Sequence, residues 1–170
     1  MMTRIRNKKI AEDKLKLRSQ LWPEVSEGDI WNRKKKTGFT TIPRAMPLIM
    51  RIIDAMSPKG KPASAVYLEL WCRAFDEHVI KFVNKEEMAF HAGFKAQRAL
   101  QPWTNRIDLL AKLGFIKLAP GPQGKRSYAL ILNPYKVVKK HFEGKKSSIP
   151  VSMYNALLER ASEIKADDLD

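Results

Sequence analysis

Hydrophobic residues recur at helical spacing in two neighbouring segments of the chain, separated by a glycine. The first segment begins at Asn84, a residue type favoured at helix N-caps, and Glu87 follows three residues later, where it can reach back to the cap amide. It ends at Gly93, which supplies a turn. The second runs from near Pro102 to Gly114. Its apolar face, with spacings of 4, 3 and 3 residues, consists of Trp103, Ile107, Leu110 and Leu113. The pattern predicts two helices joined by a turn.

Two strand-like runs follow this helix pair, at residues 115–118 and 128–132. The Gly- and Pro-rich segment between them, residues 120–126, is too long for a two-residue hairpin turn and ends in the cations Lys125 and Arg126. A third short strand, residues 79–83, is expected to pair with the other two. We therefore predict a small antiparallel sheet whose hairpin ends in a flexible, basic loop, a wing.

Further helices are predicted on both sides of this region. Residues 44–56 form a short apolar helix, in which Pro47 falls in the first turn at little cost. Residues 62–75 carry a broad apolar stripe and should be the central core helix. The stripe consists of Val66, Tyr67, Leu70, Trp71, Ala74 and Phe75. The single cysteine, Cys72, lies in this helix and is expected to be a buried structural thiol.

After the wing, Asn133 caps and Pro134 begins a helix that closes at Gly144 and shows lysines on its other face. Residues 150–164 form a last amphipathic helix. Its aligned apolar residues are Tyr154, Leu157, Leu158, Ala161 and Ile164. Such a helix either packs back on the core or pairs with a second copy of the chain as a homodimer, and the pattern leaves both open.

The N-terminal residues 1–36 show no clean helical stripe and are interpreted as a basic arm that orders on a partner. Trp22 and Trp31 are expected to anchor its connector against the core. The predicted organisation is thus a basic arm (1–36), a domain that contains the helix pair and the wing (37–146) and a C-terminal amphipathic helix with an acidic tail (147–170). The fold class is mostly α with a small antiparallel β wing, that is, α+β.

Composition supports a folded chain, since 170 residues with 44% hydrophobic content can bury one core. No apolar run approaches the roughly 20 residues needed to cross a bilayer, and no secretory signal is apparent. We expect a soluble protein of the cytoplasm, associated with the nucleoid, with no membrane partner.

The net charge of +14 is concentrated in particular segments. Residues 95–126 hold 7 basic residues against 1 acidic, and residues 1–36 hold 11 against 5, whereas residues 37–94 are nearly balanced at 7 against 6. A basic excess on the predicted helix pair, wing and arm is typical of a polyanion binder, although such surfaces are sometimes only solvated.

Catalytic motifs are not found. His78, His91 and His141 are scattered without metal-ligand spacing, and no nucleophile elbow or nucleotide-binding glycine loop is present. A lone helical histidine such as His91 is more often a surface residue than a ligand. We expect no enzymatic activity, no metal and no cofactor.

DNA-recognition chemistry is present on the second predicted helix. Arg can bond a guanine edge with two hydrogen bonds, and Asn or Gln can do the same to adenine. The candidates for base contacts are Gln97, Arg98, Gln101, Asn105 and Arg106. Cations suited to phosphates are Lys95, Lys112, Lys125, Arg126, Lys139, Lys140, Arg33, Lys34, Lys35 and Lys36. The alternative is that the helix face is merely hydrated. Trp103 is expected to pack in the core rather than stack on a base.

Taken together, VNKEEMAFHAG at residues 83–93 and DLLAKLGFI at 108–116 resemble winged helix-turn-helix proteins, whose helix pair passes through a Leu-Gly-Phe/Ile step into the wing. Upstream, GFTTIP at 38–43 and AVYLEL at 65–70 are similar to the lead-in of helix-turn-helix replication initiators and regulators of plasmids and phages. The resemblance implies that residues 37–146 are a winged-helix DNA-binding domain and that the protein belongs to a mobile element.

The leading hypothesis is therefore non-enzymatic, sequence-specific binding of double-stranded DNA, in replication initiation or transcriptional control of a plasmid, phage or other mobile element. The alternative is a winged-helix adaptor that mediates protein–protein interaction in a nucleoprotein complex. RNA binding is disfavoured, because no RNP aromatic pattern, GXXG loop or zinc knuckle occurs.

Overall fold

The computed structural model describes residues 2–95, 99–144 and 147–169, with side chains from Lys8 onward. The chain divides into two units, Met1–Phe39, which we call the N-terminal unit, and Thr40–Asp170, which we call the main unit. The last helix of the chain belongs to the main unit rather than to a segment of its own.

The N-terminal unit consists of helix α1 (Met2–Leu21) and an irregular connector. Residues from Lys8 to Leu21 are exposed, apart from Arg18, which is half-buried and forms an ion pair with Glu27. The sequence of this segment has no apolar stripe, and the side chains that the structure describes in α1 accordingly form no buried face.

The two tryptophans of the connector, for which the sequence predicts an anchoring role, are largely exposed. Trp22 and Trp31 are 53% and 59% exposed. The ring of Trp31 packs edge-on against Phe39 with 5.8 Å between centroids, inside the same unit. The connector forms local turns instead, in which the carboxylate of Asp29 accepts hydrogen bonds from the amide and hydroxyl of Ser26.

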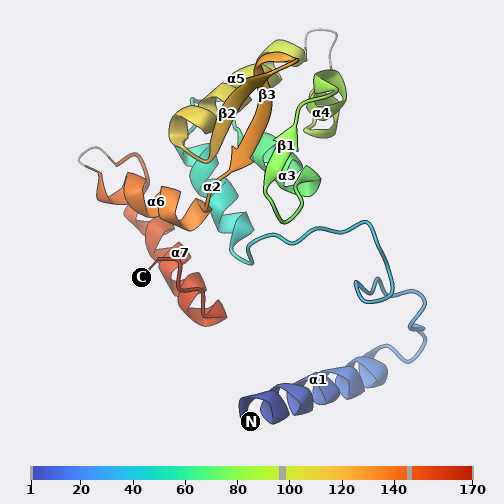
Figure 1. Cartoon of the computed structure of the whole chain (residues 1–170). Helices are drawn as coiled ribbons and strands as arrows, with labels where there is room; N and C mark the ends of the chain where they lie inside the picture. The colour runs from blue at the N-terminus through green and yellow to red at the C-terminus, as the bar shows by residue number, and fades with distance from the viewer. Residues whose placement is uncertain (1, 96–98, 145–146, 170) are drawn as a thin grey trace. The chain divides into compact units, whose positions relative to one another are not determined.

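The main unit is mixed α and β, as predicted, and contains a three-stranded antiparallel sheet in the order β1-β3-β2 (Figure 1). Its elements are α2 (Met46–Met56), α3 (Ser64–Arg73), β1 (Val79–Lys81), α4 (Lys85–His91), α5 (Leu100–Leu113), β2 (Ile116–Gly121), β3 (Gly124–Ile131), α6 (Pro134–Glu143) and α7 (Val151–Ile164). Val79 stands opposite Leu130, and Ile116 opposite Ile131. The strand predicted at residues 79–83 is therefore confirmed as a partner of the hairpin.

The helix pair α4 and α5 forms as the sequence predicts. The side chain of Asn84 accepts a hydrogen bond of 3.1 Å from the amide of Glu87, and Gly93 turns the chain at a φ of +93°. α5 begins two residues before Pro102, which still lies in the first turn, where its missing N–H costs nothing. Gly114 ends α5 in the left-handed conformation that glycine adopts without strain.

The core of the main unit is formed by buried residues of helices α2 to α7 and of the sheet. Trp103 is 1% exposed, and its ring packs edge-on against Phe82 with 5.5 Å between centroids. Tyr67 and Phe115 make a similar contact at 5.5 Å. The expectation that Trp103 packs in the core is confirmed.

The hairpin ends in a two-residue turn, so the long flexible loop expected at residues 120–126 is wrong. Gly121 pairs with Gly124 across the turn after a register shift in β2. The Ser127 hydroxyl closes the turn, because it accepts from the amide of Gln123 at 2.9 Å and donates to the carbonyl of Gly124 at 2.8 Å. A side chain at Gly121 would meet the Tyr128 ring at 2.5 Å, so this glycine is required by a close contact rather than by a loop.

Two expectations for the core helix are also wrong. α3 ends at Arg73, and Phe75, assigned to the apolar stripe, is 82% exposed. Cys72 is exposed rather than buried. The buried face of α3 passes through Val66 and Leu70, and a residue two positions after Leu70 is turned by roughly 200° from it, toward solvent.

The last helix packs back on the rest of the main unit, which is the first of the two possibilities that the sequence leaves open. Tyr154, Leu157 and Ala161 are buried, and α7 contacts α2. The rings of Phe142 and Tyr154 stack at 3.8 Å between centroids and join α7 to α6. The apolar stripe is therefore used within the chain, although Leu158 remains 39% exposed.

Candidate nucleic-acid interface

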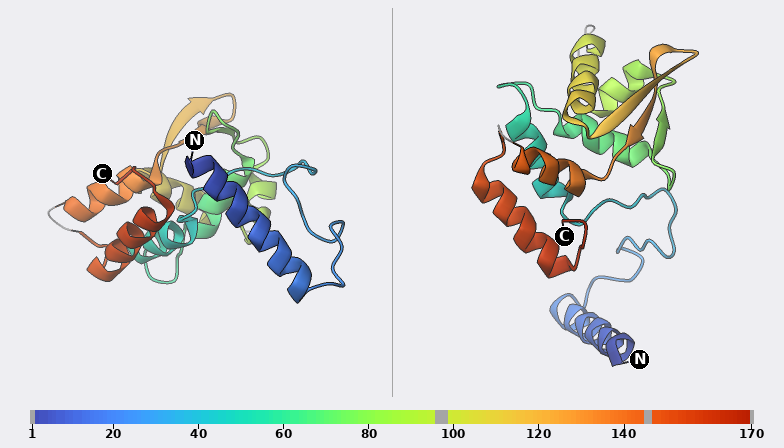
Figure 2. Two further views of the ribbon diagram at one scale, coloured as in Figure 1. Left: turned by 90° about the horizontal axis from the view of Figure 1, so that it is seen from below. Right: turned by 60° about the vertical axis from the view of Figure 1, so that its left-hand side comes forward.

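Three elements bring polar and basic groups to one end of the main unit. Figure 1 shows the beginning of α5, helix α4 and the turn of the β2–β3 hairpin at this end, with α6 and α7 at the other, and the right-hand view of Figure 2 shows the same arrangement. The ammonium of Lys85, the first residue of α4, donates to the carbonyl of Gln123 in the hairpin turn at 3.4 Å. The helix pair and the hairpin are thus joined at their polar ends.

A hollow of about 520 Å³ lies where these elements meet. It is lined by Lys85, Leu100, Gln101, Trp103, Thr104 and Arg126. The first turn of α5 faces this space, and a helix N-terminus carries a partial positive charge. The ammonium of Lys85 and the helix N-terminus at this hollow favour a negatively charged partner.

Two of the five candidates for base contacts are exposed on α5. The amide nitrogen of Gln101 donates to the side-chain oxygen of Asn105 at 2.9 Å, so both groups present hydrogen-bonding atoms on one face. Gln97 and Arg98 lie outside the described residues.

Arg106, the third described candidate, has a structural contact. Its Nε donates to the carbonyl of Pro62 at 3.0 Å, and its guanidinium lies 5.9 Å from the ring centre of Phe94. This side chain therefore ties α5 to the segment before α3. A role in base contact would require that the side chain leave this position.

Arg126, predicted to contact phosphate, is paired with an acid. Its Nε and Nη2 donate to the two carboxylate oxygens of Asp108 at 2.5 and 2.6 Å. These hydrogen bonds raise the pKa of the guanidinium above its usual value. Both side chains remain about two-fifths exposed, at 41% and 42%. The pair locks β3 to α5 and neutralises one cation of the interface.

Sequence reasoning missed Asp108 as a site residue. The signal available in the sequence was the composition of residues 95–126, because this segment contains seven basic residues and a single acidic residue, Asp108. A lone carboxylate in a basic segment is a candidate partner for one of those cations.

The remaining predicted phosphate contacts fall in different places. Lys95 is exposed in the link between α4 and α5, and Lys125 is exposed next to the hairpin turn. Lys112, in the last turn of α5, and Lys140 of α6 are exposed around one hollow. The ammonium of Lys139 donates to the carbonyl of Leu169 at 2.8 Å. The structure places the cations Arg33, Lys34, Lys35 and Lys36 as exposed residues of the N-terminal unit.

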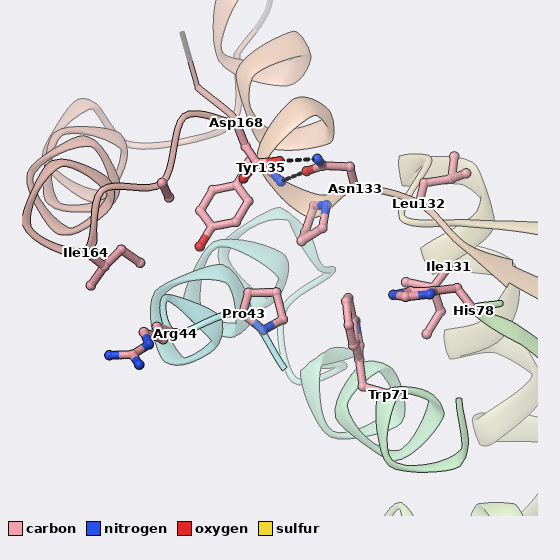
Figure 3. A pocket seen from close by; sticks show the side chains of 12 residues that line it. Pro43, Arg44, Trp71, His78, Ile131, Leu132, Asn133, Tyr135, Ile164 and Asp168 are labelled. Carbon is pink, nitrogen blue, oxygen red and sulfur yellow. Dashed lines mark hydrogen bonds between the residues drawn. The ribbon is translucent and has the colours of Figure 1, made fainter. Parts of the chain in front are cut away.

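Another pocket, of about 410 Å³, is lined by the segment before α2, the end of α3, the start of α6 and the C-terminal segment (Figure 3). The His78 ring packs edge-on against Trp71 with 5.3 Å between centroids. The Asn133 side chain donates to Asp168 at 2.5 Å and accepts from the amide of Tyr135. Figure 3 shows the His78 ring beside Trp71 and the Asp168 carboxylate turned toward Asn133. The side chains of His78 and Asp168 therefore do not point toward each other.

A polar cluster joins α3 to α4. Arg73 forms an ion pair with Glu69 and donates to Glu87 at 3.3 Å, and its Nη2 lies 2.9 Å from Nδ1 of His91. His91 is exposed, as expected for a surface histidine. Among the residues that the structure describes, no group of His, Cys, Asp and Glu side chains has an arrangement that could hold a metal ion.

Comparison with protein-family models, with curated proteins and with solved structures found no match. Within the described part of the chain, no helix has the length and apolar character to span a membrane.

Proposed function

We propose that the main unit is a winged helix-turn-helix domain that binds double-stranded DNA with sequence preference. The observation that carries this proposal is the meeting of α4, the start of α5 and the hairpin around one hollow lined by Lys85, Gln101 and Arg126. The order of elements, α3-β1-α4-α5-β2-β3, and the sheet order β1-β3-β2 support it.

In this proposal α5 enters the major groove. An α-helix fits this groove, where the amides of Gln101 and Asn105 can form paired hydrogen bonds with an adenine edge. Their mutual hydrogen bond is replaced on binding. Lys125, exposed at the start of β3, contacts the phosphate backbone and fixes the position of the helix without selecting sequence.

The biological role proposed is non-enzymatic action in replication initiation or transcriptional control of a plasmid, phage or other mobile element, inside the cytoplasm. The support for this part is the sequence resemblance of residues 38–132 together with the localised basic charge.

Selection of bound duplexes from a random library at about 150 mM salt tests the proposal, followed by a salt titration on selected and scrambled DNA. A defined motif is the expected result. Asn105→Ala should reduce the preference for the selected duplex, whereas the matched control Asn155→Ala, on the exposed face of α7, should not. Failure to retain any duplex would remove the proposal.

A second candidate is an adaptor that uses the same fold to bind protein, and exposed apolar residues at the β1 edge of the sheet favour it. Phe75 is 82% exposed, Val79 53% and its cross-strand partner Leu130 38%. Binding to a protein partner that persists in high salt, is lost in Phe75→Ser and occurs without DNA retention would favour the adaptor.

A further inference from the structure

A separate hollow lies at the opposite end of α5 from the proposed DNA-binding face. It has a volume of about 620 Å³ and is formed by the last turn of α5, the start of β2 and the first two turns of α6. Lys112 in this wall follows Gln101 by 11 positions on one helix, a rise of roughly 16 Å. Pockets of about 300–1,000 Å³ are the usual size for small-molecule sites.

The floor of this hollow is apolar. Ile116 is 1% exposed, and the side chains of Leu113, Leu132 and Val137 are half-buried around it. An apolar floor open to water gains free energy when an apolar group covers it.

The rim of the hollow is basic. Its lysines are Lys112, Lys117, Lys136 and Lys140. All four are exposed, and none of them forms a salt bridge with a carboxylate among the residues that the structure describes. The lining contains no Asp or Glu. Four like charges around one opening repel each other, and an anion between them relieves that repulsion.

Two local features add to the preference for an anion. Lys136 and Val137 belong to the first turn of α6, and the N-terminal end of a helix carries a partial positive charge. Nε2 of His141 lies 2.7 Å from the carbonyl of Leu113 and must donate, because a carbonyl only accepts. This bond satisfies a carbonyl at the end of α5 that would otherwise add negative charge to the hollow.

We propose that this hollow binds a small organic anion, an apolar ring or short chain that carries a carboxylate, phosphate or sulfonate group. The apolar part covers the half-buried side chains of Leu113, Leu132 and Val137. The anionic group lies between the ammonium groups of Lys136 and Lys140, which are four residues apart on one face of α6. This site is distinct from the proposed DNA-binding face and does not depend on that proposal.

The combination of charge and apolar floor distinguishes this ligand class from a second DNA segment. Duplex phosphates would contact the lysine side chains and leave the apolar floor exposed to water. A purely electrostatic surface would therefore not require half-buried apolar residues such as Leu132 and Val137 in its lining.

The test uses the full chain and the fluorescent probe 8-anilinonaphthalene-1-sulfonate, which joins an apolar ring system to one sulfonate. Saturable binding by the wild type is expected. Lys136→Gln/Lys140→Gln should weaken it by about tenfold, because two charge-assisted contacts are lost. The matched control Lys59→Gln/Lys61→Gln, exposed in the α2–α3 loop, should bind as the wild type does.

A floor variant and two simpler probes separate the contributions. Val137→Thr keeps the shape of a half-buried side chain and should weaken the probe several-fold while circular dichroism stays unchanged. Inorganic sulfate, which lacks the apolar part, and neutral N-phenyl-1-naphthylamine, which lacks the charge, should each bind at least about tenfold more weakly than the probe.

Three results would overturn the proposal. The first is that the wild type shows no saturable binding of the probe. The second is that the Lys136/Lys140 variant binds it as well as the wild type. The third is that sulfate binds as tightly as the probe and that random duplex DNA displaces the probe in a way that depends on Lys136 and Lys140. That result would make the hollow a phosphate-contacting surface for DNA.

Discussion

Replacing Asp108 by Asn is expected to strengthen the binding of every duplex. In the free protein the carboxylate of Asp108 holds Arg126 through two hydrogen bonds of 2.5 and 2.6 Å and cancels its charge. The Asn side chain keeps the shape and removes the negative charge. Arg126 then offers an uncompensated guanidinium next to Lys85 and Gln101 at the proposed interface.

The size of the effect follows from the charge that is removed. A phosphate bound to the free side of the Arg126 guanidinium would lie about 6 Å from the carboxylate of Asp108, where the repulsion is about 0.7 kcal/mol in the dielectric of water. Loss of this repulsion corresponds to about a threefold lower Kd at low salt, and less at physiological salt, where charges are screened over about 8 Å. One further neutralised phosphate steepens the log–log salt dependence by up to about 0.9.

Fluorescence anisotropy with a labelled duplex, titrated at several salt concentrations, measures both quantities. The stability cost should be small, because a pair whose side chains are 41% and 42% exposed contributes at most about 1 kcal/mol. Asp76→Asn, the same substitution at an exposed position in the α3–β1 turn, is the control and should leave affinity unchanged. Weaker binding by Asp108→Asn with unaltered thermal unfolding would refute this reasoning, because the pair would then position Arg126 for DNA rather than mask it.

Three further predictions follow from the same geometry. Lys125→Ala should weaken selected and random duplexes equally and make the salt slope shallower by about 0.9, measured by anisotropy; a loss confined to the selected duplex would contradict a phosphate contact. Asn105→Ala should cost roughly 1–3 kcal/mol of discrimination between the selected duplex and one changed at a single base pair, and equal losses on both would remove Asn105 from base contact. Trp103→Ala should lower the free energy of unfolding in urea by about 3–5 kcal/mol, because this ring is 1% exposed in the core; a loss below about 1 kcal/mol would contradict that packing.

The local elements of the main unit were predictable because their signals lie within a few residues of each other. Asn84 and Glu87 specify the start of α4, Asn133 and Pro134 specify the start of α6, and Gly114 ends α5. Helix caps and left-handed glycines act on backbone groups a few residues away, so the sequence pattern alone indicates where a helix begins and ends. Helical spacing likewise identified the buried face of α5.

The candidate site was predictable in its residue types but not in its pairings. Gln101 and Asn105 are exposed, as the pattern of α5 indicates. The partners of Arg106 and Arg126 lie 44 and 18 residues away in the chain, at the Pro62 carbonyl and at Asp108. A side chain's partner depends on which elements meet in space, and no periodicity encodes that.

The sequence by itself determined where most helices and strands lie and which helix faces are apolar, because backbone preference and hydrophobic period are local properties. Only the tertiary structure decided how those faces are used. α7 buries Leu157 and contacts α2, about 100 residues earlier in the chain. Asp108 of α5 pairs with Arg126 of β3. These outcomes depend on contacts between residues distant in sequence, whose free energies are realised only when the elements pack together.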